Sequence, residues 1–532
     1  MKIVRGIVIA ATLVALAGVM VAGLRWATGL EALPLSVAAD MPSLAGKQPA
    51  PAFPVGLDWI NTGGRPVTIK ELRGKVVLLD FWTYGCINCF HVIPDLEKLQ
   101  KNYANKLVII GVHSAKFATE RKTAHIEAVV LRYGIDHPVV NDKDMQIWNA
   151  YGAEGWPTLT VIDPAGNVVG QVSGEGQYDL LNKVIGSLIE EFSVKGLINP
   201  KPLWFSGIHV EMPKTALLYP GKVLADADHD RLFIADSNHN RIVVTTLSGK
   251  VLAVIGDGKP GLRDGDYAHT QFHYPQGMAL AGTDSLYVAD TDNNAIRKIN
   301  LATHRVTTVA GDGRRIYMTD TSMAARTAEL NTPWAVLFHD GLLYIAMAGQ
   351  HQLWSFDPLA NTINLYAGSG QEGIDDGPLL RASFAQSSGL TTDGKYLYVA
   401  DPEASAVRQV GFGPGAQVRT LVGTGLFDFG DVDGVGDAVR LQHDLGITWD
   451  SGHLYIADTY NSKIKVFDPK IRRVTTFASG SDEFDEPGGL SAAGDYLYVA
   501  DTDHNRIAVV DLKTGKISSL KLEDPQHLLA QP

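Results

Sequence analysis

The chain has 532 residues, 45% of them hydrophobic, and a formal net charge of −12. This length exceeds what one hydrophobic core usually holds, so we expect two or three domains of an ordinary globular protein. The negative charge and the lack of any Lys/Arg run exclude a general nucleic-acid binder, because phosphate neutralisation needs clustered basic side chains. The two cysteines are too few for a disulfide scaffold and suit a redox pair.

The N-terminus carries a candidate membrane segment. Lys2 and Arg5 precede an uncharged run, residues 6–24, that is rich in Ala, Val, Leu and Ile. Such a run spans a bilayer or forms the apolar core of a signal peptide. We therefore expect residues 1–26 to be an uncleaved anchor or a removed signal segment, and either places the rest of the chain outside the cytoplasm. Residues 27–52, rich in Ala, Pro and Ser, predict a flexible linker.

Alternating strand and helix patterns over residues 53–195 predict one compact α/β domain with a mixed central sheet. The strands and short apolar segments are expected at 76–80, 107–112, 138–140, 159–162 and 168–172. The helices are expected at 86–103, 120–133, 145–151 and 178–192.

The chemistry of this domain is concentrated where the first of these strands meets the first helix. The apolar run breaks at Gly85, which places Cys86 and Cys89 in the helix's first turn. There the unpaired N–H groups and the helix dipole favour a thiolate, and a two-residue spacer allows a short disulfide. A static or inert cysteine pair is the alternative, and a metal site lacks enough nearby ligands.

Asp80 ends the buried strand that leads to the cysteines. A carboxylate is costly there unless it has a task, so we expect burial to raise its pKa and let it exchange a proton near neutral pH. The alternative is an exposed residue at the strand end. His91, His113 and His125 show no partner pattern and are interpreted as surface or core histidines.

A second pattern begins after a linker at residues 196–212, which contains Pro200-Lys-Pro202. One phrase then recurs six times at intervals of 43 to 57 residues, each copy within a unit of four short predicted strands. This repeat predicts an all-β, six-bladed β-propeller over residues 213–532, with a solenoid as the alternative. The copies are Leu232-Phe-Ile-Ala-Asp236, Leu286-Tyr-Val-Ala-Asp290, Leu343-Tyr-Ile-Ala-Met347, Leu397-Tyr-Val-Ala-Asp401, Leu454-Tyr-Ile-Ala-Asp458 and Leu497-Tyr-Val-Ala-Asp501.

The aspartates that close five of these phrases precede turns, where Asp side chains bond to nearby backbone N–H groups. Their repetition indicates an architectural role. Two acidic loops, Asp375-Asp376-Gly377 and Asp431-Val-Asp433-Gly434, offer oxygen ligands of the kind that divalent cations prefer. No twelve-residue calcium loop is present, so no metal or cofactor is assigned.

The stretch Asp80-Phe-Trp-Thr-Tyr-Gly-Cys86-Ile-Asn-Cys89, followed by Pro94, resembles a thioredoxin active site. Gly155-Trp156-Pro157-Thr158-Leu159 resembles the cis-proline loop of that fold. The domain is similar to the extracytoplasmic, membrane-tethered TlpA/ResA-like branch, and the repeats resemble NHL repeats. The combination resembles the NHL repeat-containing protein 2 group, in which a Cys-Ile-Asn-Cys centre precedes NHL-repeat blades.

This resemblance implies a role for each site residue. Cys86 would be the attacking thiolate, and Cys89 would resolve the mixed disulfide. Asp80 would help to deprotonate Cys89, and Pro157, preceded by Trp156, would dock an extended substrate. Departures from the thioredoxin pattern include Gly85 where Trp is usual, the Ile-Asn spacer, the bulky Trp156, and no acidic residue within 111–116.

The sequence therefore predicts a membrane-tethered, extracytoplasmic thiol–disulfide oxidoreductase. Its expected partners are protein thiols and disulfides at the cysteine pair, a further protein on the propeller face, and the membrane through the N-terminal segment. The alternative is a propeller-based scaffold whose thioredoxin-like domain is not catalytic.

Overall fold

The structure is a computed structural model that describes residues 43–316, 320–480 and 483–530. The candidate membrane segment at residues 6–24 and most of the predicted linker 27–52 lie outside these ranges. Within the described ranges, no helix is both long and apolar enough to span a bilayer. Residues 45–532 form one compact unit.

The first domain is built on a mixed sheet whose seven described strands have the order β1-β7-β6-β3-β4-β5-β2. β3 lies at the centre, parallel to β4 and antiparallel to β6. The strands are β1 (Gln48–Pro49), β2 (Trp59–Ile60), β3 (Val76–Trp82), β4 (Leu107–His113), β5 (Val139–Asn141), β6 (Thr158–Ile162) and β7 (Asn167–Ser173). The helices are α2 (Ile87–Phe90), α3 (Ile93–Tyr103), α4 (Thr123–Arg132), α5 (Gln146–Tyr151) and α6 (Tyr178–Val194).

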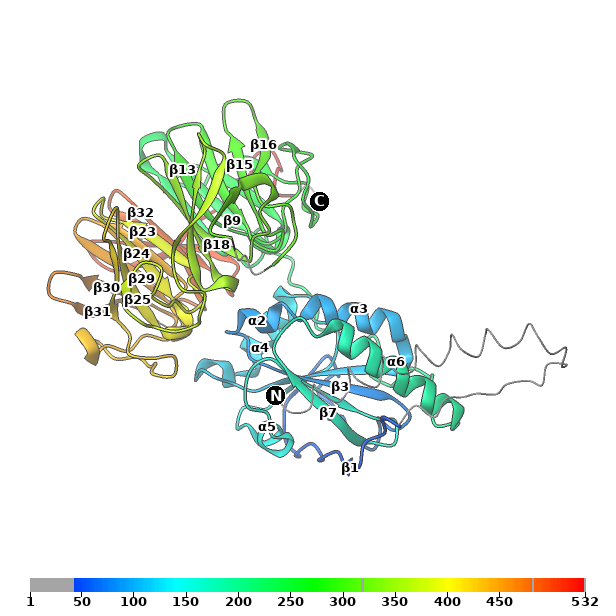
Figure 1. The fold of residues 1–532 in the computed structure, drawn as a ribbon. Coiled ribbons are helices and arrows are strands. Elements are labelled where there is room, and N and C mark those ends of the chain that lie inside the picture. The colour runs from blue at the N-terminus through cyan, green and yellow to red at the C-terminus, as the bar shows by residue number, and fades with distance from the viewer. Residues whose placement is uncertain (1–42, 317–319, 481–482, 531–532) are drawn as a thin grey trace, which may run out of the picture. The chain divides into compact units, whose positions relative to one another are not determined.

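All seven residues of β3 are buried, because helices and loops cover both faces of the sheet. Val76 and Leu78 point to the face covered by α3 and α6, which pack against each other (Figure 1). The alternate residues of β3, among them Leu79, pack on the opposite face with Trp148 of α5. Because successive side chains of a strand point to opposite faces, β3 contributes side chains to the core on each face of the sheet. The cysteine pair follows the C-terminal end of β3.

Two predicted helices differ from the structure. The helix expected at 86–103 is divided into α2 and α3, because Pro94 has no N–H to continue the hydrogen-bond ladder and suits a helix start instead. The helix expected at 120–133 begins only at Thr123, after a 3₁₀ turn at Thr119–Arg121. Glu120 is therefore buried in that turn and does not lie on a polar helix face.

The second domain is the predicted six-bladed propeller, formed in the described residues by six antiparallel sheets. The innermost strands β8, β13, β18, β23, β28 and β32 each pack against the next, and β32 packs against β8, which closes the ring. A closed ring excludes the solenoid alternative. Four blades also carry a short fifth strand at the outer edge, which the repeat pattern did not predict.

The strands of the first three blades are β8 (Lys222–Asp226), β9 (Arg231–Asp236), β10 (Arg241–Thr245), β11 (Val251–Ile255), β12 (Gly265–Asp266), β13 (Pro275–Ala281), β14 (Ser285–Asp290), β15 (Ala295–Asn300), β16 (Arg305–Ala310), β17 (Ser322–Ala324), β18 (Pro333–His339), β19 (Leu342–Met347), β20 (Gln352–Asp357) and β21 (Thr362–Ala367). Those of the last three are β22 (Gly377–Pro378), β23 (Gly389–Thr392), β24 (Tyr396–Asp401), β25 (Ala406–Gly411), β26 (Gln417–Val422), β27 (Gly434–Val435), β28 (Gly446–Asp450), β29 (His453–Asp458), β30 (Lys463–Asp468), β31 (Arg473–Ser479), β32 (Pro487–Ala493), β33 (Tyr496–Asp501), β34 (Arg506–Asp511) and β35 (Ile517–Ser519).

The repeated aspartates have the architectural role that their position predicts. In blade 2, Asp290 accepts a hydrogen bond from the backbone N–H of His273 at 2.7 Å and pairs with the fully buried Arg297 at 2.7 Å. The aspartates of the other four phrases accept an equivalent backbone N–H: Leu218 to Asp236, Ala385 to Asp401, Gln442 to Asp458 and Asp485 to Asp501. Each aspartate therefore ties the second strand of its blade to the loop that leads into the first.

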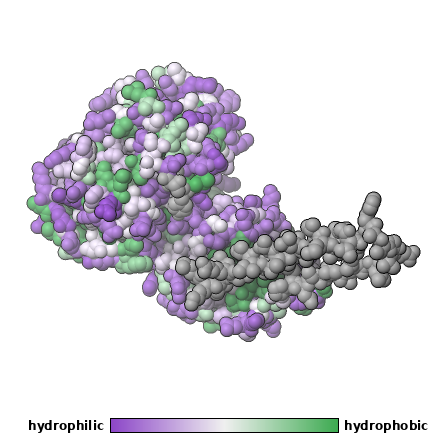
Figure 2. All heavy atoms as spheres, in the orientation of Figure 1, coloured by the Kyte–Doolittle hydropathy of each residue, from purple (hydrophilic) through white to green (hydrophobic). Residues whose placement is uncertain are grey.

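The acidic loops are engaged by basic side chains. Asp376 pairs with Arg408, and Asp431 and Asp433 both bind the Lys465 ammonium group. Within the described ranges, no cluster of three or more His, Cys, Asp and Glu side chains could hold a metal ion. Hydrophilic residues cover most of the face shown in Figure 2, and apolar residues are scattered among them.

Candidate redox site

The cysteine pair lies directly beyond the C-terminal end of β3. Cys86 is the N-cap residue of α2, with an extended backbone, and Cys89 lies inside that helix. The two cysteines are not joined by a disulfide in the structure, and the backbone N–H of Cys89 donates to Cys86 Sγ at 3.2 Å. This bond places a hydrogen-bond donor from the first helical turn on the Cys86 sulfur. This arrangement favours Cys86 as the nucleophile.

Cys89 and Asp80 are two further acidic groups of the site, and both are buried. Cys89 is 2% exposed, and burial raises the pKa of its thiol well above the usual range, with a smaller contribution from the charge of Asp80. Asp80 is 4% exposed, and burial raises its pKa to about 7. The exposed alternative for Asp80 is therefore wrong. A thiol that resists ionisation beside a carboxyl that titrates near neutrality is suited to proton exchange.

The raised pKa of Asp80 predicts a pH-dependent effect on stability. Its folded-state pKa of about 7 lies above the unfolded value of about 4. The folded state therefore holds a proton that the unfolded state releases, and stability falls as pH rises from about 4 to about 7. Asp80→Asn removes this penalty, which is at most about 4 kcal/mol. We expect the variant to raise Tm more at pH 8 than at pH 4; an equal shift at both pH values would contradict it.

The loop that carries Pro157 faces the same end of the sheet. The Trp156–Pro157 peptide bond is cis. The Trp156 indole N–H donates to the Ser114 carbonyl at 3.0 Å, and its ring packs against Trp148 with centroids 4.7 Å apart. Trp156 is thus anchored to the first domain, and the docking role of Trp156 and Pro157 stays a prediction.

Glu120 is a site residue that the sequence patterns missed. Its carboxylate accepts hydrogen bonds from the Gly85 N–H at 2.9 Å, the Thr83 hydroxyl at 2.5 Å, and the backbone N–H groups of Lys116 and Phe117 at 2.7 and 2.9 Å. Burial raises the pKa of Glu120 to about 7, although these hydrogen bonds act in the opposite direction. The sequence placed it only at the start of a predicted helix, so the fold alone reveals that it holds the loop before Cys86.

Three propeller residues also contact the first domain around this loop. Gln386 accepts a hydrogen bond from the Ile87 N–H at 2.9 Å, and Glu403 forms a buried ion pair with Lys116. A Cβ atom on Gly85 would lie 3.2 Å from Glu403 Oε1 and 3.2 Å from His443 Cε1. Gly85 thus stands in the place of the usual thioredoxin tryptophan at a point where the propeller comes close. With the propeller in this place, Cys86 is only 6% exposed.

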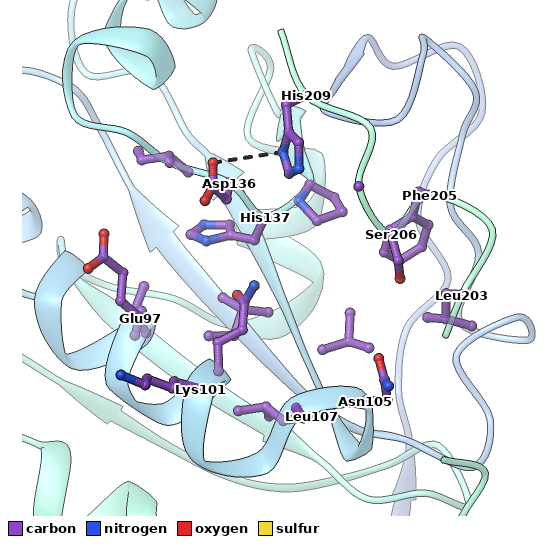
Figure 3. Close-up of a pocket in the computed structure, with 18 of the residues that line it drawn as sticks. Glu97, Lys101, Asn105, Leu107, Asp136, His137, Leu203, Phe205, Ser206 and His209 are labelled. Atoms are coloured by element: carbon purple, nitrogen blue, oxygen red, sulfur yellow. Dashed lines mark ion pairs between the residues drawn. The ribbon is translucent and has the colours of Figure 1, made fainter. Parts of the chain in front are cut away.

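A separate cavity of about 710 Å³ lies between α3 and residues 203–209, which follow the first domain (Figure 3). Its lining includes Lys75 and Leu107, at the starts of β3 and β4, and an Asp136–His209 contact of 3.8 Å at its rim. The cysteine pair follows the opposite end of β3. This cavity therefore does not belong to the redox site.

Comparisons with known proteins agree with this geometry. Residues 74–168 match the family model described as thioredoxin-like, and residues 488–520 match an LVIVD repeat. Human NHL repeat-containing protein 2 is 41% identical over 488 residues, covering 83% of this chain and 66% of that protein. Arabidopsis thaliana protein SUPPRESSOR OF QUENCHING 1, chloroplastic, is 40% identical and covers 83% of this chain and 43% of that protein. Bacillus anthracis thiol-disulfide oxidoreductase ResA is 33% identical over 112 residues, covering 21% of this chain and 62% of that protein.

The fold and the dithiol define a protein with a thioredoxin-like domain joined to a six-bladed β-propeller of NHL-type repeats. The chain is a homologue of NHL repeat-containing protein 2 and spans about two thirds of the length of that relative.

Proposed function

We propose that the chain is a thiol–disulfide oxidoreductase whose substrates are protein thiols and disulfides. The observation that carries the proposal is the dithiol itself: Cys86 at a helix N-terminus, with a backbone N–H on its sulfur, and Cys89 beside the buried Asp80. The similarity of the thioredoxin-like domain to ResA supports the same chemistry.

The proposed cycle begins with the Cys86 thiolate attacking one sulfur of a substrate disulfide. The substrate S–S bond breaks, its second sulfur leaves as a thiolate, and Cys86 is joined to the substrate in a mixed disulfide. Cys89 then passes its proton to the Asp80 carboxylate and attacks Cys86 Sγ. The substrate leaves as a dithiol, reduced by two electrons, and Cys86 and Cys89 become a disulfide. The reverse sequence oxidises a substrate dithiol.

A turnover assay with insulin as the disulfide substrate and dithiothreitol as the electron donor tests this proposal. We expect the full-length chain to reduce insulin at least about tenfold faster than a Cys86→Ser/Cys89→Ser double variant. With the double variant, only the slow direct reduction of insulin disulfides by dithiothreitol remains. Equal rates for the two proteins would contradict the proposal.

A second candidate function is a propeller-based scaffold with a non-catalytic thioredoxin-like domain. One observation favours it: both thiols are buried in the structure, whereas reactive cysteines are usually partly exposed. Equal insulin reduction by the wild type and the double variant is the result that this candidate expects.

The proposal includes a location. Lys2 and Arg5 before the uncharged residues 6–24 favour an N-terminal membrane anchor with the two domains on the extracytoplasmic side. Membrane fractionation combined with N-terminal sequencing tests it. Recovery of the chain, with its N-terminus intact, only in the soluble fraction would contradict the anchor.

A further inference from the structure

The propeller contacts the first domain through residues that surround the cysteine pair. The residues contacted are Tyr84, Gly85, Ile87, His91, Lys116, Phe117, Ala118, His125, Arg132 and Tyr133. They come from the loop that precedes Cys86, from α2 and the turn after it, from the segment after β4, and from α4 with its C-cap. The propeller thus covers the edge where a thioredoxin-like domain meets its substrate.

One set of propeller contacts comes from an equivalent position in every blade. We call these the pre-strand positions, because they lie one to three residues before the innermost strands: Tyr219, Tyr274, Thr332, Gln386, His443 and Glu486. All six touch the first domain. Tyr219 lies over the Arg132 guanidinium, Tyr274 packs on Tyr133, Thr332 binds His91 at 2.7 Å, Gln386 binds Ile87, His443 packs on Phe117, and Glu486 accepts from the Tyr84 hydroxyl at 2.9 Å.

A second set lies two residues after the end of each repeated phrase. These post-strand positions are Asn238, Asp292, Gly349, Glu403, Tyr460 and Asp503. Five of the six contact the first domain: Asn238 donates to the Arg132 carbonyl at 2.6 Å, Gly349 lies against the His91 ring, Glu403 pairs with Lys116, Tyr460 packs on Tyr84, and Asp503 lies 3.6 Å from Arg132. Equivalent positions in a repeat therefore carry different side chains that together fit one asymmetric partner.

The pre-strand positions are also conformationally unusual. All six have a positive φ, between 46° and 64°, although none is glycine. For the β-branched Thr332, at 54°, this is a rare backbone conformation. Such strain persists where surrounding contacts hold it, and it concentrates at functional surfaces. The strained positions coincide with the surface that covers the dithiol.

Two cavities lined by both domains lie beside the dithiol helix: one of about 60 Å³ at Gly85 and Ile87, and one of about 430 Å³ at Phe90 and His91. Cys86, which is 6% exposed, lines neither of them. Gln386 already accepts the Ile87 N–H, in the first turn of the dithiol helix. A substrate protein therefore reaches Cys86 only if the propeller moves away.

We propose that the propeller is a reversible cover of the dithiol, held by the pre-strand and post-strand positions, and that opening of this interface controls access of protein substrates to Cys86. The interface contains aromatic contacts and also buried polar groups that water would satisfy on opening. Arg132 pairs with Glu486 at 2.9 Å, and Glu403 Oε1 and His443 Nδ1 are buried without a hydrogen-bond partner in the described chain. Unsatisfied buried groups regain hydrogen bonds on exposure to water, which lowers the free energy of the open state. The substrate class rests on the proposed function, but the cover itself does not.

Alkylation of the reduced, full-length chain tests the cover without any enzymatic activity. The chain contains two cysteines, so iodoacetamide modification can be followed directly by intact mass. We expect slow modification of the wild type. Arg132→Glu places a third carboxylate against Glu486 and Asp503 and should accelerate modification at least tenfold. Arg121→Glu is the matched control, since it makes the same charge change at an exposed site in the neighbouring segment.

A second variant opens the interface by a different route. Gly85→Trp introduces the side chain usual in thioredoxins, whose Cβ would lie 3.2 Å from Glu403 Oε1 and His443 Cε1 of the propeller and 3.1 Å from Glu120 Oε1 of the first domain. It should also accelerate alkylation at least tenfold, with unchanged far-UV circular dichroism. Rapid alkylation of the wild type, or wild-type rates in both opened variants, would overturn the cover. Loss of insulin reduction in all proteins, with alkylation as expected, would contradict the oxidoreductase and leave the cover supported.

Discussion

Replacing Cys89 with serine is expected to trap the chain as disulfide-linked complexes with its protein substrates. Without the Cys89 thiol, the mixed disulfide on Cys86 has no internal nucleophile and persists until an external thiol reaches it. In the cell of origin or an extract, non-reducing gels should show high-mass species that contain the chain and disappear on reduction. At least a tenfold increase over the wild type is expected.

The matched control for this trap is Cys86→Ser, which removes the proposed nucleophile and retains the buried Cys89. It should form no such species, because Cys89 is 2% exposed and burial raises the pKa of its thiol. Equal trapping by both variants would contradict the assignment of Cys86 as nucleophile. Absence of trapping in Cys89→Ser would count against the whole cycle.

Replacing Arg297 with methionine is expected to produce the largest loss of stability in the propeller. The Arg297 guanidinium is fully buried and donates to Asp290 at 2.7 Å, to Asp264 at 3.0 Å and to two backbone carbonyls. Methionine has a similar volume but leaves the buried Asp290 without its cation. Breaking one side of a buried ion pair costs about 3–5 kcal/mol. Denaturant-induced unfolding measures this loss.

Lys298→Met is the control, because Lys298 neighbours Arg297 on β15 but is only partly buried. Its cation lies 5.7 Å from the Tyr287 ring, an interaction worth about 1 kcal/mol or less at such a site. Similar unfolding free energies for the two variants would show that the buried network does not support the blade.

The pattern of apolar and polar residues predicted the structure correctly where the period of side chains along the backbone decides it. The buried run before Gly85 became β3, and the six repeated phrases became the second strands of six blades. The burial of Asp80 also followed from its neighbours, since an acid at the end of a strand buried on both faces cannot reach water. These features depend on residues a few positions apart.

The spacing of apolar residues was less reliable at Pro94 and Glu120. The helical period of apolar residues continues through Pro94, although proline has no backbone N–H and the helix is divided there. The predicted helix also began at Glu120, whereas Glu120 lies in a turn before the helix and its carboxylate accepts hydrogen bonds from four donors around the loop before Cys86. Hydrogen-bond satisfaction, which spacing does not report, decided that position.

Local periodicity and burial were enough to predict the two folds, the position of the cysteines at a helix start, and the buried acid near them. That the propeller covers the dithiol follows from long-range contacts, which are seen only in the folded chain. The contacts responsible join residues about 90 to 400 positions apart, such as Arg132 with Tyr219 and Tyr84 with Glu486. Their side chains differ from blade to blade, so no repeat pattern reveals them, and the meaning of Gly85 as a place of close approach emerged only with its neighbours.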